Sequence, residues 1–160
     1  MKRVAIEGVA DPVDVLTNQR LLDVLVANGI PLLMACGGKG LCATCHVHVT
    51  TGAQQLSPRT PREQLSLRML SHQQANSRLA CQAKVTGEGV TVTLPQGRYL
   101  IATKDLDSLV GRRAEERVLH PVDGRVLIEP GKIITRSRIR ELAHVSVDLA
   151  EMHTRSLSDA

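Results

Sequence analysis

Four cysteines are the residues whose type and spacing could do chemistry in this 160-residue chain. Cys36, Cys42 and Cys45 lie within one short string, ACGGKGLCATCH, and Cys81 follows after thirty-five further residues. Thiolate sulfur is the soft ligand that zinc and iron–sulfur clusters take from proteins. The C-x5-C-x2-C spacing with one distant cysteine therefore predicts a metal or redox site that two remote segments close together.

A zinc ion, a cluster of two irons and two sulfides (2Fe–2S) and free structural thiols are the alternatives for these cysteines. Structural zinc sites more often use two C-x2-C pairs, and this chain has one. A 2Fe–2S cluster needs four thiolates and a loop whose N–H groups can turn inward, which Gly37, Gly38 and Gly40 permit. The spacing favours the 2Fe–2S cluster. Because the fourth ligand is distant, we expect cluster binding and folding to be coupled.

The composition and the N-terminus indicate a reducing compartment. Glu7, Asp11 and Asp14 come too early for a secretory signal peptide, and no apolar stretch approaches the length of a membrane span. We therefore expect a cytoplasmic protein without membrane insertion, where disulfides are rare. The chain has one tyrosine, no phenylalanine and no tryptophan, so any core must be aliphatic.

Strand and helix patterns flank the cysteines. Residues 2–9, 46–50 and 89–95 alternate apolar and polar side chains, as half-buried strands do. Residues 18–29 carry a broad apolar stripe, and we expect Asn18 to cap this helix and Gly29 to end it.

A second helix is predicted to begin after Thr60. Thr60 is placed as the N-cap, Pro61 takes the first helical position, and Glu63 falls three residues after the cap. This is a capping box with proline where its missing N–H costs nothing.

The second part of the chain differs in charge and pattern. Residues 1–98 hold ten Lys and Arg against six Asp and Glu, whereas residues 99–160 hold ten of each. Residues 120–131 contain an Asp-Gly turn and an apolar run, which predict a β-hairpin. A helix capped by Thr135 or Ser137 is expected to follow and to lead into a last strand, HVSVDL.

The string CGGKGLCATC, followed by RLAC, resembles the 2Fe–2S ferredoxins of the β-grasp fold, and its C-x5-C spacing is similar to the adrenodoxin-like and bacterial branch. The resemblance covers residues 1 to about 96. It implies an α+β protein, with a β-grasp ferredoxin domain over 1–98 and a small β-hairpin-plus-helix extension over 99–160. It also implies the four cluster ligands, which are Cys36, Cys42, Cys45 and Cys81.

The function implied by this resemblance is one-electron transfer from a reductase to an acceptor enzyme or complex. The chain itself is not expected to be an enzyme, because it offers no carboxylate pair, Ser/His set or phosphate loop. The alternative is a redox-responsive or structural subunit held in a larger assembly through residues 99–160. That extension weakly resembles a small module of the bacterial RNA polymerase β′ subunit, and we expect it to serve docking or packing.

Charge predicts the kind of partner. The formal net charge is +4, and the acidic partner-binding surface usual in these ferredoxins is missing. We therefore expect a reductase and an acceptor with acidic docking surfaces. A nucleic-acid partner is the lesser interpretation, because aromatic side chains and a recognition motif are missing. The basic residues that would suggest it are Arg59, Arg62, Arg68, Arg78 and Lys84.

Three residues in or beside the cysteine loop could tune the site. Lys39 is either a solvated loop residue or a positive charge that raises the reduction potential and contacts an acidic partner. Met34 and Leu41 flank the loop and would shield a cluster from water, although both also suit ordinary core positions.

His46 and His48 are predicted to project from one face of the strand that follows the loop. Rieske centres use two histidines and two cysteines. Here four cysteines complete the ligand set, so we expect both histidines to face solvent. Arg78, close before the fourth cysteine, is expected to hold its segment in place.

Overall fold

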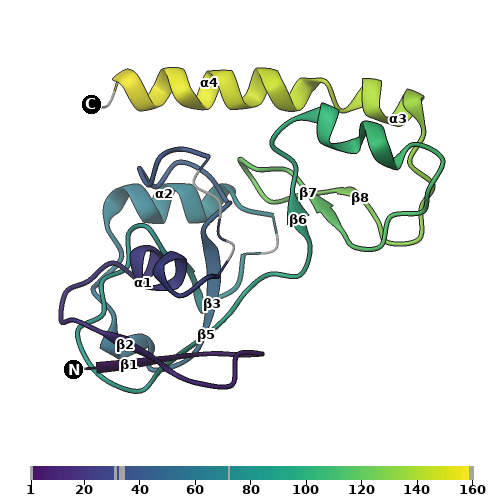
Figure 1. The fold of residues 1–160 in the computed structure, drawn as a ribbon. Coiled ribbons are helices and arrows are strands. Elements are labelled where there is room, and N and C mark those ends of the chain that lie inside the picture. The colour runs from purple at the N-terminus through teal and green to yellow at the C-terminus, as the bar shows by residue number, and fades with distance from the viewer. Residues whose placement is uncertain (1, 31, 33–34, 72, 159–160) are drawn as a thin grey trace.

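The computed structural model describes residues 2–30, 32, 35–71 and 73–158, which form two sheets and the helices packed on them (Figure 1). The larger sheet has the order β2-β1-β5-β3-β4. Its strands are β1 (Lys2–Ile6), β2 (Val13–Val15), β3 (His46–Thr51), β4 (Ser77–Leu79) and β5 (Val90–Thr93). β1 and β5 run parallel, with Val4 opposite Val90, and the other neighbours are antiparallel.

The predicted strands of the first part are confirmed, and so is the aliphatic core. Val47 and Val49 on β3 and Val90 and Val92 on β5 are all buried. They pack with the leucines of helix α1 in one cluster of buried side chains. The alternation of apolar and polar residues in these strands therefore identifies the face of the sheet that packs against the core.

Helix α1 (Leu21–Ala27) begins later than predicted. Its N-cap is Arg20, and Asn18 instead takes a left-handed conformation with φ of 67°. The reason is tertiary: the Asn18 N–H donates to Val85 O and the Leu21 N–H to Ala83 O, so this stretch pairs with a distant segment before the helix starts. Gly29 follows the helix with φ of 79°, as predicted.

Helix α2 (Pro61–Met69) begins as predicted, after a short 3-10 turn η1 (Ala53–Gln55). The Glu63 N–H donates to Thr60 Oγ1 over 3.1 Å, which is the expected N-cap bond. The carboxylate of Glu63 does not complete the capping box. It is fully buried and pairs with Arg78 on β4.

The second part is built on a three-stranded sheet with the order β6-β7-β8. Its strands are β6 (Arg98–Tyr99), β7 (Val118–Leu119) and β8 (Val126–Ile128), and a 3-10 helix η2 (Thr103–Leu109) follows β6. β7 and β8 pair antiparallel, which confirms the predicted hairpin. Helix α3 (Arg136–Glu141) follows, and the Arg138 N–H donates to Thr135 Oγ1, so Thr135 is its cap.

The predicted last strand is wrong: HVSVDL begins helix α4 (His144–Ser158). In a strand Val145 and Val147 would share a face, but Val145 is 1% exposed and Val147 is 57% exposed. Val145 and Met152, which are seven residues apart, are both buried, and seven residues are two helical turns. Packing at this spacing overrides the local alternation of valines.

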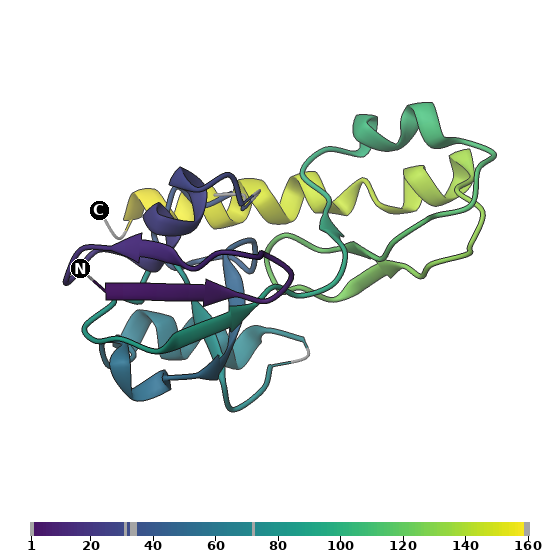
Figure 2. The same ribbon diagram turned by 60° about the horizontal axis from the view of Figure 1, so that its bottom comes forward.

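Helix α4 runs back from the second part over the first, as Figures 1 and 2 show from two directions. Its far end lies beside the loop that holds three of the cysteines, where Met152 is buried with two of them. Among the described residues, no helix is both long and apolar enough to cross a membrane.

Candidate metal centre

The fold brings all four predicted ligands together. Cys36, Cys42, Cys45 and Cys81 are free thiols, and none is more than 5% exposed. Their side chains form two hydrogen-bonded pairs, Cys36 with Cys42 and Cys45 with Cys81. Cys45 and Cys81 are far apart in the sequence, and the sheet brings them together.

The pairing of β3 with β4 is what places Cys81. His46 lies opposite Leu79 in the antiparallel register, and the Ala80 N–H donates to Cys45 O over 3.0 Å. Cys81 therefore emerges from β4 beside the residue that precedes β3. The fourth ligand depends on a long-range strand pair, as the sequence predicted in outline.

The glycines of the loop turn backbone N–H groups toward sulfur. Gly37, Gly38 and Gly40 have φ values of 70°, 79° and 75°. The Gly38, Lys39 and Leu41 N–H groups hydrogen-bond the Cys36 sulfur, and the Gly40 N–H hydrogen-bonds that of Cys81. A Cβ at position 40 would lie 3.0 Å from the side chain of Gln82, so that side chain would have to shift to admit any residue other than glycine.

The local electrostatics suit bound thiolates. A hydrogen bond from Cys42 lowers the pKa of Cys36 to about 5, while the same bond and burial raise the pKa of Cys42. Likewise, the hydrogen bond between Cys45 and Cys81 lowers the pKa of Cys81. The same bond, together with burial, raises the pKa of Cys45. Metal binding requires thiolates and would displace any proton that the thiols hold. Four converging sulfurs with inward N–H donors fit an iron–sulfur cluster.

Three polar residues around the sulfurs were not predicted from the sequence. Thr44 Oγ1 lies 3.1 Å from the Cys42 sulfur, and Gln82 Nε2 lies 3.6 Å from that of Cys81. Both stand next to a ligand in the sequence, which is the only signal that could have found them. Arg20 comes from a distant segment: its Nη1 would be 3.3 Å from a Cβ at Gly38. Its pKa is raised by its hydrogen bond with Asp23 and, more weakly, by the sulfurs of Cys81 and Cys45.

The residues expected to tune the site divide into three cases. Lys39 is exposed at the tip of the loop, as both of its interpretations require. Leu41 is half-buried and packs against the hydrophobic group that contains Cys36 and Cys42, as both of its interpretations require. Met34 lies outside the described residues.

The expectation that His46 and His48 face solvent is wrong. His46 is 5% exposed, with Nε2 2.8 Å from Ser77 Oγ, and His48 is half-buried. The two rings do share one face of β3, with centroids 4.6 Å apart. Burial, helped by the charge of His48, lowers the pKa of His46 to about 4. The second part of the chain lies over this face: its Tyr99, Arg117 and Leu119 line a cavity of about 370 Å³ with both histidines.

Arg78 has the structural role predicted for it. Its Nε donates to both carboxylate oxygens of Glu63, over 2.7 and 3.0 Å, and both side chains are buried. This pair joins β4, which delivers Cys81, to helix α2.

Comparison with known proteins adds independent evidence. Residues 4–86 match the model of the 2Fe-2S iron-sulfur cluster binding domain family. The chain is 32% identical over 96 residues to 2Fe-2S ferredoxin-5 of Aquifex aeolicus, covering 59% of this chain and all of that protein. It is 31% identical over 101 residues to putidaredoxin of Pseudomonas putida, covering 60% of this chain and 94% of that one.

Solved structures give the same result. A crystal structure of the ISC-like 2Fe-2S ferredoxin from Pseudomonas putida aligns with a TM-score of 0.56 at 29% identity, covering 59% of this chain and 93% of that chain. Putidaredoxin in its covalent complex with putidaredoxin reductase aligns with a TM-score of 0.51 at 31% identity, covering 59% and 98%. The expected α+β ferredoxin fold is thereby confirmed. Nothing in these comparisons supports the resemblance of residues 99–160 to an RNA polymerase module.

Proposed function

Because the chain belongs to the 2Fe-2S iron-sulfur cluster binding domain family, we propose that Cys36, Cys42, Cys45 and Cys81 hold the cluster and that the protein carries single electrons from a reductase to an acceptor enzyme or complex. The observation that carries this proposal is the convergence of four buried thiols from two remote segments. We assign the cluster to residues 1–98 and treat residues 99–160 as an extension packed against it.

A bound 2Fe–2S cluster supplies one-electron chemistry. The residues around it control its surroundings. The inward N–H groups of the loop and the hydroxyl of Thr44 stabilise negative charge on sulfur, and the guanidinium of Arg20 adds a positive charge nearby. Burial of all four cysteines keeps water from the ligands.

A reductase partner is supported by putidaredoxin, whose solved complex contains its reductase. For this chain we propose partners with acidic docking surfaces, since its excess of basic residues lies in residues 1–98. We place the function in the cytoplasm, where reduced thiols remain available for iron.

The alternative of a permanent subunit in a larger assembly gains no support from the comparisons. Part of the surface of the extension packs against the cysteine loop of the same chain, where Met152 is fully buried with Cys36 and Cys42. This packing favours a carrier whose extension contacts its own ferredoxin domain and not a partner subunit.

Anaerobic purification of the full chain tests the proposal. The expected product is coloured, contains iron and acid-labile sulfide in equal amounts, and gives a paramagnetic signal after dithionite reduction. Replacement of any one of the four cysteines by serine is expected to lower the iron content sharply, while a control variant that keeps all four cysteines, Ser57→Ala, retains it. A colourless protein that binds zinc would refute the proposal.

A further inference from the structure

The extension touches the cysteine loop through residues 120–125, which connect β7 to β8 and which we call the bridging loop. The Ala43 N–H donates to Pro121 O over 2.9 Å. The Ser71 N–H donates to Asp123 O over 2.8 Å. The first bond engages the turn between Cys42 and Cys45, and the second engages the chain just after helix α2. The bridging loop is thus tied by one backbone bond to the cysteine loop and by a second to the chain that follows helix α2.

Helix α4 lies against the same region. Met152 is fully buried and packs with Cys36 and Cys42, and the half-buried Leu149, one turn earlier on α4, joins the same cluster. Val122 of the bridging loop completes this apolar contact. Two elements of the extension therefore close one side of the site.

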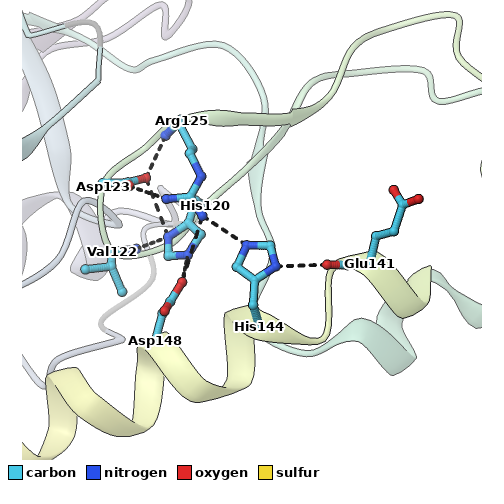
Figure 3. Close-up of polar contacts among 7 residues, drawn as sticks. All are labelled: His120, Val122, Asp123, Arg125, Glu141, His144 and Asp148. Carbon is cyan, nitrogen blue, oxygen red and sulfur yellow. Dashed lines mark hydrogen bonds and ion pairs between the residues drawn. The ribbon is translucent and has the colours of Figure 1, made fainter. Parts of the chain in front are cut away.

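A polar network joins α4 to the bridging loop (Figure 3). His120, which is 1% exposed, accepts the Val122 N–H at Nδ1 over 3.1 Å. Its proton must therefore sit on Nε2, which donates to Asp148 Oδ2 over 2.7 Å. Arg125 Nη2 lies 2.9 Å from His144 Nε2 and 3.9 Å from Asp148 Oδ2.

His120, His144 and Asp148 also have the chemistry of a metal site, with ligand atoms within 4.8 Å of one another. The hydrogen bonds argue against a metal. His120 Nε2 carries a proton, and His144 Nε2 accepts from the guanidinium of Arg125. A metal ion would need both lone pairs and would face the positive charge of Arg125. The network of His120, Arg125, His144 and Asp148, which we call the latch, instead links α4 to the bridging loop by hydrogen bonds.

We propose that α4 and the bridging loop form a latched cover over the Cys36 and Cys42 side chains, and that electrons are exchanged at the part of the cysteine loop that stays exposed, an open edge formed by Gly37 and Lys39. This inference rests on the proposed carrier function. Gly37 and Lys39 are exposed, and Arg20 lies beside Gly38 with its side chain 41% exposed. The open edge is basic, so it fits an acidic protein surface.

The cover is tested by Met152→Lys in the full chain, with Val147→Lys as its control on the exposed face of the same helix. We expect Met152→Lys to bleach about tenfold faster than wild type when an iron chelator is added without oxygen, because lysine cannot stay buried there. Val147→Lys should bleach at the wild-type rate. Equal rates in the two variants would overturn the cover.

The latch is tested by Asp148→Ala, with Glu151→Ala as the control because Glu151 is exposed on α4. Hydrogen exchange of the holo-protein is the measurement, and it does not depend on electron transfer. Loss of the His120 and Arg125 partners should speed exchange along α4. If Asp148→Ala and Glu151→Ala exchange alike, the network is not a latch.

The open edge is tested by Lys39→Glu, with Lys132→Glu as the control. Lys132 is also exposed and follows β8 in the extension. Reduced holo-protein is oxidised by anionic ferricyanide or by a cationic cobalt hexaammine. We expect Lys39→Glu to slow the first and speed the second by about threefold or more at low salt, and Lys132→Glu to change neither. Equal changes of the oxidation rates in Lys39→Glu and Lys132→Glu would refute electron exchange at the Gly37–Lys39 edge. A purified chain without an iron–sulfur cluster would instead refute the proposed function itself.

Discussion

Arg78 Nε donates to both carboxylate oxygens of Glu63, and the Glu63 side chain is completely buried. A charge removed from water in this way is tolerated only because its partner is present. The pair links helix α2 to strand β4, and β4 delivers Cys81 to the metal centre. The stability of the site therefore depends on two residues, Glu63 and Arg78, that take no part in the hydrogen bonds to sulfur described above.

Glu63→Gln is expected to destabilise the protein by about 3–5 kcal/mol, because it leaves the Arg78 charge buried without a counter-charge. Denaturant unfolding of the holo-protein measures the change. The control is Glu88→Gln, since Glu88 is exposed, and it should shift the unfolding free energy by no more than about 0.5 kcal/mol. Similar losses in the two variants would show that the ion pair is not what holds α2 to β4.

Gly40→Ala is expected to reduce cluster incorporation more than Gly37→Ala does. The two glycines share a left-handed backbone, with φ of 75° and 70°, so alanine costs about 1–2 kcal/mol of backbone strain at each. Only at position 40 would the new Cβ meet the side chain of Gln82, at 3.0 Å, whereas position 37 is open. Iron content per chain is the measurement, and equal iron contents would contradict the steric argument.

Thr44→Val is expected to lower the reduction potential. The Ala35 N–H donates to Thr44 Oγ1 over 3.2 Å, which leaves the hydroxyl proton free for the Cys42 sulfur at 3.1 Å. A hydrogen bond to a ligand sulfur stabilises the reduced, more negative cluster. If the ~1 kcal/mol of an ordinary hydrogen bond acts fully on that state, the shift is about 40 mV. Spectroelectrochemical titration measures it, and Thr50→Val on the exposed end of β3 should leave the potential in place.

Removal of the cluster is expected to lower the melting temperature by about 10 °C or more, because a cluster bound by all four sulfurs would tie the cysteine loop to the segment that follows β4. Calorimetry of the holo-protein and of the same protein after anaerobic chelation measures the difference. Reconstitution with iron and sulfide should restore the original melting temperature. An apo-protein that melts with the holo-protein would show that folding and cluster binding are independent.

Local signals in the sequence predicted much of the part that holds the site. Thr60 and Pro61 begin a helix, Gly29 ends one, and the alternating valines of β3 and β5 lie in the core. Each of these depends on a backbone preference or a side-chain period that a few neighbouring residues set. Predictions failed where distant segments competed: Asn18 pairs with Val85 instead of capping a helix.

The chemistry of this protein was determined by its sequence alone, because four cysteines at this spacing among loop glycines suit few cofactors. What surrounds that chemistry was decided only by the tertiary structure. His46 is buried and lines a cavity together with residues of the second part of the chain. HVSVDL forms a helix in which Val145 and Met152 both pack against buried apolar side chains. Ligand type and spacing are local properties of the chain, whereas burial is a property of whatever packs against it.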